Sequence, residues 1–159
     1  MIHINIICVG KIKEKYLKDA IQEYSKRLSK YCKLSIIEIP DESIPDNVND
    51  KMSNIIKEIE GKKILSHIKN SYIIALDLKG TQYTSEEFSN KINNISLNFN
   101  SNISFIIGGS LGLSNEVVNS SNELLCFSKM TFPHQLIRVF LLEQIYRAFK
   151  ILNNESYHK

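Results

Sequence analysis

The chain has 159 residues, of which 43% are hydrophobic and 23% are charged, and its formal net charge is +3. These values are ordinary for a folded protein with a substantial core, and the charge is too small to identify a nucleic-acid-binding protein by itself. The first residues lack the basic and apolar segments of a signal peptide, and no apolar run is long enough to span a membrane. We expect a cytoplasmic protein with one domain, residues 1–159.

In chain order, the hydrophobic pattern alternates between short β-branched runs, which predict buried strands, and apolar stripes at three- and four-residue spacing, which predict helices. We expect strands at residues 2–9, 34–39, 72–76, 103–107 and 124–127. We expect helices at about residues 14–32, 50–69, 84–97, 115–120 and 131–152. This alternation is typical of an α/β fold with a mainly parallel sheet flanked by helices.

Local signals refine the ends of these helices. Thr84 and Glu87 have the spacing of a capping box, which satisfies free N–H groups at a helix start. Thr131 and Pro133 suit the first turn of the last helix, where proline loses no needed hydrogen bond. Gly61 is a candidate interruption of the second helix.

The three cysteines, Cys8, Cys32 and Cys126, are widely separated and odd in number. They therefore form neither a disulfide framework nor a zinc-binding pattern. We expect reduced side chains that pack as small hydrophobic groups, and no bound metal.

Charge is distributed unevenly along the chain. Residues 1–33 carry eight Lys or Arg against three acids, whereas residues 34–60 carry seven acids against two lysines. Five cations lie mostly away from the apolar stripe of the predicted first helix: Lys15, Lys18, Lys26, Arg27 and Lys30. Such a face suits contact with RNA phosphates, but it also suits an ordinary solvated helix.

Ligands in open parallel sheets bind outside the carboxyl ends of the strands, so the loops after Leu76, Ile107 and Phe127 are candidate binding loops. The second of these, Gly-Gly-Ser-Leu-Gly at 108–112, allows the backbone to approach a ligand closely. It lacks the Gly-Lys-Ser/Thr of a P-loop, and it follows the fourth strand rather than the first, where a dinucleotide fingerprint belongs. The alternative is a tight turn only.

The third loop, Ser-Lys-Met-Thr-Phe-Pro-His-Gln at 128–135, precedes a helix N-terminus whose free backbone donors can hold a carboxylate or ring nitrogens. Phe127, Met130 and Phe132 suit the walls of an adenine site. The alternative is an amphipathic turn capped by Thr131, with His134 as an ordinary first-turn residue.

The last helix is apolar around almost its whole circumference. Such a helix must be buried on all sides, and a second subunit is the simplest way to cover its outer face. We therefore expect a homodimer, with a helix covered by its own chain as the alternative. Its few polar positions are expected near the interface: Arg138, Glu143, Arg147 and Lys150.

Several of these segments together resemble one known family. They are Gly10-Lys11, Ile-Gly-Gly-Ser at 107–110, Phe-Ser-Lys-Met-Thr-Phe-Pro-His at 127–134, Glu-Gln-Ile-Tyr-Arg-Ala at 143–148, and Tyr-His-Lys at 157–159. Over its whole length the chain resembles the ribosomal RNA large subunit methyltransferase H family, the pseudouridine-N3 methyltransferases of the SPOUT superfamily. The Ser-Lys-Met-Thr-Phe-Pro-His block followed by Glu-Gln-Ile-Tyr-Arg-Ala is highly specific, whereas the glycine loop alone is not. The resemblance implies a C-terminal trefoil knot, a homodimer, and S-adenosylmethionine as the donor for methylation of a pseudouridine in the 23S rRNA of assembled ribosomes.

The resemblance also implies two sets of site residues. The cofactor-binding set is Leu76, Gly108, Phe127, Ser128, Lys129, Met130, Thr131 and Phe132. The set that serves the target base is His134, Glu143, Arg147, Tyr157 and His158. The chain departs from some relatives at Lys159, where they carry arginine plus a further residue, and lysine lacks bidentate geometry toward a phosphate.

Methyl transfer from a sulfonium is an in-line displacement that needs no metal and depends on positioning. Arg147 can stabilise the negative charge that develops on the imide, and His134, His158 or Glu143 can accept its proton. The sequence does not rank these three, although His158 has the advantage that a chain terminus can close over the base. Two other functions remain open: a nicotinamide-dependent oxidoreductase and an RNA-binding module without catalysis.

Overall fold

The protein alternates strictly between strands and helices in a computed structural model that describes residues 1–159. The strands are β1 (Ile2–Val9), β2 (Cys32–Ile39), β3 (Tyr72–Thr81), β4 (Asn102–Ile107) and β5 (Glu123–Leu125). The helices are α1 (Lys15–Leu28), α2 (Asp50–Ser66), α3 (Ser85–Asn98), α4 (Asn115–Ser120) and α5 (His134–Leu152). Every predicted element is present, and the α/β fold class is confirmed.

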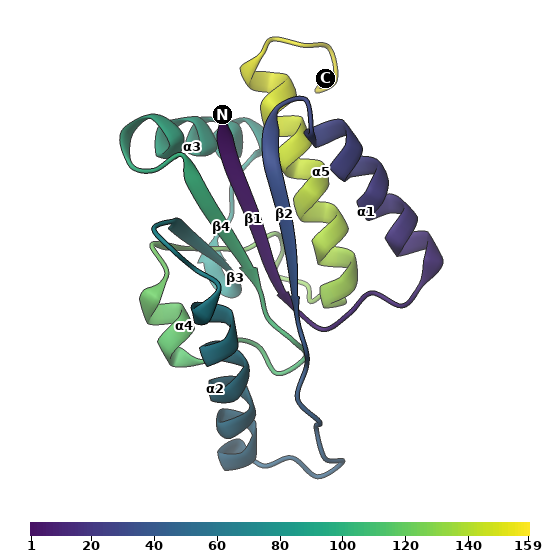
Figure 1. The fold of residues 1–159 in the computed structure, drawn as a ribbon, viewed down its shortest axis with the longest axis vertical. Coiled ribbons are helices and arrows are strands. Elements are labelled where there is room, and N and C mark those ends of the chain that lie inside the picture. The colour runs from purple at the N-terminus through teal and green to yellow at the C-terminus, as the bar shows by residue number, and fades with distance from the viewer.

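All strand pairs are parallel, and the strand order is β2-β1-β4-β3-β5. A parallel connection must cross a face of the sheet, so both faces are covered by helices. Helices α1, α3 and α5 pack together on one face, and α2 and α4 pack together on the other (Figure 1). The trefoil knot remains an expectation from the resemblance.

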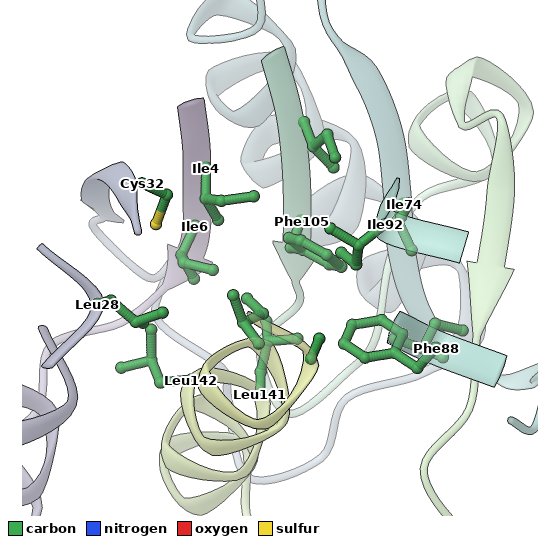
Figure 2. Close-up of a cluster of buried hydrophobic side chains, with 14 of the residues drawn as sticks. Ile4, Ile6, Leu28, Cys32, Ile74, Phe88, Ile92, Phe105, Leu141 and Leu142 are labelled. Atoms are coloured by element: carbon green, nitrogen blue, oxygen red, sulfur yellow. The ribbon is translucent and has the colours of Figure 1, made fainter. Parts of the chain in front are cut away.

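The central strands are buried on both sides, as the continuous apolar run of residues 2–9 predicted. On one side, Ile4 and Ile6 of β1 and Phe105 of β4 pack with Leu141 and Leu142 of α5 (Figure 2). On the other side, a smaller cluster packs beneath α2 and α4: Ile7, Val9, Ile39, Ile64, Ala75, Ile106 and Val117. The three cysteines are buried and unpaired, as expected, and burial raises the pKa of Cys8 to about 11.

The structure confirms the predicted capping box and corrects the predicted interruption of α2. The Thr84–Glu87 capping box is present, with both reciprocal hydrogen bonds. Gly61 does not interrupt α2: it is buried, and an added Cβ would lie 2.5 Å from the Ser114 Oγ. A side chain at this position would therefore push α2 away from α4, which explains a glycine within the helix.

Other boundaries differ from the sequence prediction by a few residues. Helix α1 ends at Leu28, because Cys32 already pairs in β2, and α5 begins at His134 with Pro133 as its N-cap. Strand β3 continues to Thr81, but Leu76 and Thr81 both pair with Leu125, so residues 77–80 bulge out of the sheet. This bulge lies at the edge where the candidate binding loops meet.

Within one chain, α5 is buried on one side only. Leu141, Leu142 and Ile145 are fully buried against the sheet and its neighbouring helices, whereas Phe140 is 38% exposed. Arg138, expected near a subunit interface, is instead 1% exposed inside the chain. No helix combines the length and the apolar character needed to cross a bilayer.

Candidate functional site

A cavity of about 550 Å³ opens at the carboxyl edge of the sheet. All three loops predicted from the strand ends line it, together with the first turn of α5. The expected cofactor-binding residues that line it are Leu76, Gly108, Phe127, Ser128, Met130, Thr131 and Phe132. Lys129 is exposed and does not line the cavity. The β3 bulge adds Asp77, Leu78 and Lys79, which the sequence analysis did not single out.

The glycine loop is both a tight turn and a wall of the cavity, so its two interpretations do not exclude each other. Gly109 and Gly112 form an isolated antiparallel bridge, and Gly112 has a φ of +88°, which favours glycine. A Cβ at Gly108 would lie 2.9 Å from the Leu113 Cδ2 and 3.1 Å from the Gly112 carbonyl carbon. Glycine is needed at 108 because the loop folds back onto itself.

The loop before α5 is shaped by Ser128 rather than by Thr131. The Met130 N–H donates to the Ser128 Oγ at 3.0 Å, and no side chain caps the helix at Pro133. The Phe132 ring meets the Phe140 ring edge-on, with centroids 5.7 Å apart. The loop is thus held by local contacts that turn Phe127, Met130 and Phe132 toward the cavity.

An ion pair between the buried Arg138 and the more exposed Glu38 joins α5 to the ends of β1 and β2. Arg138 donates to the Glu38 carboxylate at 2.8 Å and to the Gly10 carbonyl at 3.1 Å. The same carboxylate accepts the Ile12 N–H at 3.1 Å. Gly10 has a φ of +91°, and a Cβ there would lie 3.7 Å from the His134 Nε2, so the segment 10–12 lies beside the imidazole. Sequence reasoning missed this pair because Glu38 and Arg138 are separated by 100 residues.

Burial and charge lower the pKa of His134. Burial acts first because it disfavours the imidazolium, and the nearby Arg138 guanidinium acts in the same direction. The Asp41 carboxylate opposes both effects. Because its pKa is lowered, His134 is neutral at pH 7. It lines the cavity, and one of its ring nitrogens can accept a proton there.

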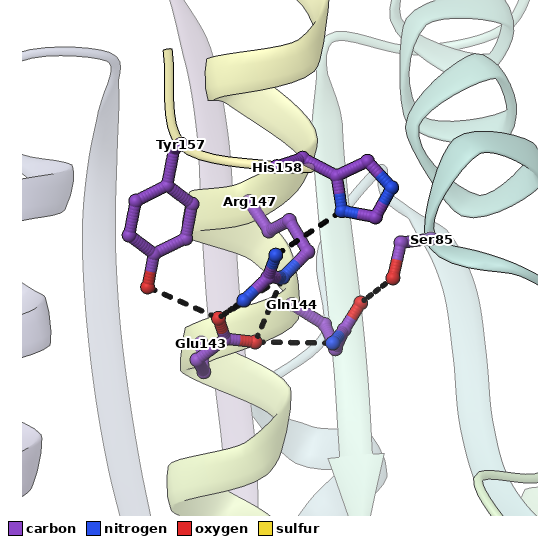
Figure 3. Close-up of polar contacts among 6 residues, drawn as sticks. All are labelled: Ser85, Glu143, Gln144, Arg147, Tyr157 and His158. Atoms are coloured by element: carbon purple, nitrogen blue, oxygen red, sulfur yellow. Dashed lines mark hydrogen bonds and ion pairs between the residues drawn. The ribbon is translucent and has the colours of Figure 1, made fainter.

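A polar network lies on the middle of α5 (Figure 3). Glu143 accepts hydrogen bonds from Arg147 at 2.6 Å, Tyr157 at 3.1 Å and Gln144 at 3.0 Å. Arg147 also donates to the His158 Nδ1 at 3.1 Å. Because arginine only donates, Nδ1 accepts, and Nε2 is the nitrogen that donates to other groups. Burial first, and then Glu143, raise the pKa of Tyr157 to about 12.

The network reaches α3 through two contacts that the sequence did not predict. The Ser85 hydroxyl donates to the Gln144 side-chain oxygen at 2.8 Å, and the His158 Nε2 lies 2.6 Å from the Glu86 carboxylate. These contacts hold Tyr157 and His158 against α5 and α3. The structure therefore places Tyr157 and His158 against these helices, although the sequence analysis considered a terminus that closes over the base.

A second cavity of about 510 Å³ lies between the first cavity and this network. Both cavities are lined by the same five residues: Leu125, Cys126, Phe127, Ser128 and Phe132. Glu143, Gln144 and Ser85 line the opposite side of the second cavity. Of the residues expected to serve a target base, His134 thus borders the first cavity and Glu143 the second, with Arg147, Tyr157 and His158 behind Glu143.

Comparisons with known proteins identify the family of the chain. Residues 2–158 match a family model described as "Predicted SPOUT methyltransferase". The chain is 65% identical over 158 residues to "Ribosomal RNA large subunit methyltransferase H 1" of Clostridium perfringens (strain SM101 / Type A), covering 99% of each chain. It is 67% identical over 158 residues to the methyltransferase H of Clostridium botulinum (strain 657 / Type Ba4), again covering 99% of each chain.

Solved structures show the same fold at low sequence identity. A probable methylase family protein from Haemophilus influenzae Rd KW20 superposes with a TM-score of 0.56 at 14% identity, covering 98% of this chain and 70% of the other. A putative methylase family protein from Neisseria gonorrhoeae gives a TM-score of 0.50 at 12% identity, covering 98% and 95%.

The lowered pKa of His134 leads to a measurable prediction. In an NMR titration, we expect its midpoint below the ordinary histidine value of about 6.5. Asp41→Asn should lower this midpoint further, because it removes the carboxylate that favours the imidazolium. The folded state favours neutral His134, whereas the unfolded state binds the proton at the ordinary histidine pKa. The free energy of unfolding should therefore decrease as the pH falls below about 6.5. A midpoint at or above the ordinary value would contradict the assignment.

Proposed function

We propose that this chain, which belongs to the SPOUT methyltransferase family, uses S-adenosylmethionine to methylate N3 of a pseudouridine in the 23S rRNA of assembled ribosomes. The observation that carries the proposal is the cavity whose walls contain seven of the eight expected cofactor-binding residues. The relatives named as ribosomal RNA large subunit methyltransferases support the RNA substrate. We place the enzyme in the cytoplasm, with the ribosome.

The residues of the first cavity fit S-adenosylmethionine. Its volume of about 550 Å³ is in the range of small-molecule sites. Phe127, Met130 and Phe132, which line the cavity, would hold the adenine, and the glycine loop would hold the rest of the molecule. When bound, the cofactor supplies an electrophilic methyl group on a sulfonium. The protein's own task is to hold this donor and to align the acceptor with it.

The second cavity suits the acceptor base, because it shares a wall with the first and is bordered by polar groups. Arg147 is paired with Glu143 at 2.6 Å, and its guanidinium can stabilise negative charge on a base that loses its imide proton when the base reaches it past that carboxylate. Among the groups considered for this proton, Glu143 and His158 are already engaged by other side chains. His134 is neutral and borders the donor cavity. We therefore assign the proton to His134 rather than to His158, which requires the imide edge of the base to extend past the shared wall into the first cavity.

The two other functions make different demands. A nicotinamide-dependent oxidoreductase would place a pyrophosphate on the glycine loop, whereas an RNA-binding module has no need of a cavity at the strand ends. Calorimetry separates all three: the proposal requires binding of S-adenosylmethionine and no binding of NAD. Methylation of purified ribosomes with labelled S-adenosylmethionine then tests the reaction itself.

Gly108→Val tests the donor cavity. The new side chain would meet Leu113 and the Gly112 backbone, and overpacking of this kind typically costs about 1–3 kcal/mol. We expect the loop to shift and S-adenosylmethionine binding to be lost in calorimetry, while the circular dichroism spectrum is retained. Ser120→Val, at an exposed position of α4 that does not line the cavity, is the control and should bind normally. Undiminished binding by Gly108→Val would show that the cofactor lies elsewhere.

We propose a homodimer that covers the outer face of α5. Phe140 is 38% exposed, and Met130 in the adjoining loop is 74% exposed. A second copy would bury these side chains and supply the cover that α5 lacks within one chain. Phe140→Asp should therefore give a folded monomer in light scattering, whereas Ile145→Asp, in the chain's own core, should unfold the protein. A parental protein that is already monomeric would overturn the dimer.

The structure narrows the expected RNA contacts on α1. Lys15 is paired with Asp19, Arg27 with Glu23, and Lys30 lies 3.9 Å from Glu155. Lys18 and Lys26 are exposed and have no such partner, so they are the α1 cations most available to phosphates.

Reversing the charge of both lysines should raise the apparent KM for ribosomes roughly three- to tenfold and leave S-adenosylmethionine affinity unchanged. The matched control reverses Lys51 and Lys62, which are exposed on α2 across the sheet. An equal effect of the two pairs would mean that α1 is not an RNA-binding face.

A further inference from the structure

The chain reverses direction immediately after α5. Asn154 has a φ of +54°, and the Glu155 N–H returns to the Lys150 carbonyl at 2.9 Å. A left-handed residue of this kind commonly ends a helix and redirects the chain. As a result, Tyr157 and His158 run back along the side of α5 and lie on either side of Arg147 (Figure 3).

The Glu155 carboxylate is bound by two elements at the point of reversal. It accepts hydrogen bonds from the Tyr31 hydroxyl at 2.8 Å and from the Lys150 ammonium at 2.5 Å. Tyr31 lies in the turn between α1 and β2, and its ring stacks on Phe149 of α5 with centroids 5.7 Å apart. Because the ring is fixed against the helix, its hydroxyl is a donor in a set position.

This arrangement differs from an ordinary surface ion pair. An exposed ion pair between two mobile side chains adds little to the free energy of unfolding, because the entropy lost in ordering both side chains offsets their attraction. Here the Lys150 side chain is 17% exposed, and its ammonium also lies over the Tyr31 ring, 5.9 Å from the centroid. Hydrogen bonds from Lys150, and then from Tyr31, lower the pKa of the Glu155 carboxyl, so it stays ionised at neutral pH.

This carboxylate helps to place the next residues, together with the contacts that Tyr157 and His158 make with α5 and α3. Tyr157 follows only two positions later, and its ring lies 4.7 Å from the Arg147 guanidinium carbon and 5.0 Å from the Tyr146 ring. A free segment from 153 to 159 would sample many conformations, and each would have to be given up when the acceptor nucleotide binds. Fixing the segment at residue 155 removes that cost in advance.

We propose that Glu155, held by Tyr31 and Lys150, is a positioning residue for methyl transfer that fixes how the chain leaves α5 and so presents Tyr157 and His158 to the acceptor nucleotide. The proposal rests on the proposed function. Glu155 touches no reacting atom and acts only through the residues that follow it. The contact joins the turn after α1 to the C-terminal segment, so the segment is held close to the end of the basic helix.

Glu155→Ala tests the proposal in the full-length protein with ribosomes as substrate. We expect kcat to fall about tenfold, the effect of losing hydrogen bonds to a charged group, while the KM values for ribosomes and S-adenosylmethionine stay unchanged. Amide hydrogen exchange at residues 156–159 should become faster, with little change in Tm. Glu155→Gln should recover part of kcat, because its amide oxygen still accepts from Tyr31. Glu116→Gln, which removes an exposed carboxylate on α4, is the control and should behave as the parent.

Tyr31→Phe provides the second arm. Tyr31→Phe alone should also lower kcat. Added to Glu155→Ala, it should have no further effect, because both changes break the same contact between Tyr31 and Glu155. Additive losses, an unchanged kcat in Glu155→Ala, or unchanged exchange at residues 156–159 would each overturn the positioning role. If the parental protein itself methylates no ribosomal RNA, the proposed function fails, and that result is distinct from an active parent with an equally active Glu155→Ala.

Discussion

A parallel sheet imposes one constraint from which the rest of this molecule follows. Successive strands that run in the same direction need a connection across a face of the sheet, so helices cover both faces and every carboxyl end lies at one edge. Here that edge gathers the bulge at 77–80, the glycine loop and the segment before α5 around one cavity. The candidate donor site is therefore a consequence of topology, and its particular residues decide what it binds.

Helix α5 connects this edge to the second group of functional residues. Its first turn carries His134 at the donor cavity, and its middle carries Glu143 and Arg147 beside the second cavity. The buried Arg138 fixes the start of the helix to the ends of β1 and β2, and Glu155 fixes the chain just beyond its end to the turn that follows α1. The helix is thus tied at both ends, which holds the two cavities and the polar network in one rigid arrangement.

The sequence predicted features that depend on neighbours along the chain. Every strand and helix followed from hydrophobic spacing, and the capping box at Thr84 followed from its local pattern. The walls of the donor cavity followed from strand ends, although Lys129 turned outward because the segment is shaped by the Ser128–Met130 contact.

Features that depend on partners distant in sequence were missed. Glu38 and Arg138 are 100 residues apart, and Tyr31 and Glu155 are 124 apart, so no spacing reveals either pair. The role of Gly61 was misjudged for the same reason: its need for space is set by Ser114 on another helix. The position of Tyr157 and His158 was likewise set by contacts with α3 and α5 that only the folded chain brings together.

Mass-spectrometric mapping of 23S rRNA from a strain that lacks this gene, with and without a plasmid copy, tests the proposed reaction. We expect one pseudouridine to lose its N3 methyl group in the deletion strain and to regain it on complementation. Complementation with a Gly108→Val copy should leave that nucleotide unmethylated. Identical methylation of the rRNA in the parental and deletion strains would contradict the account.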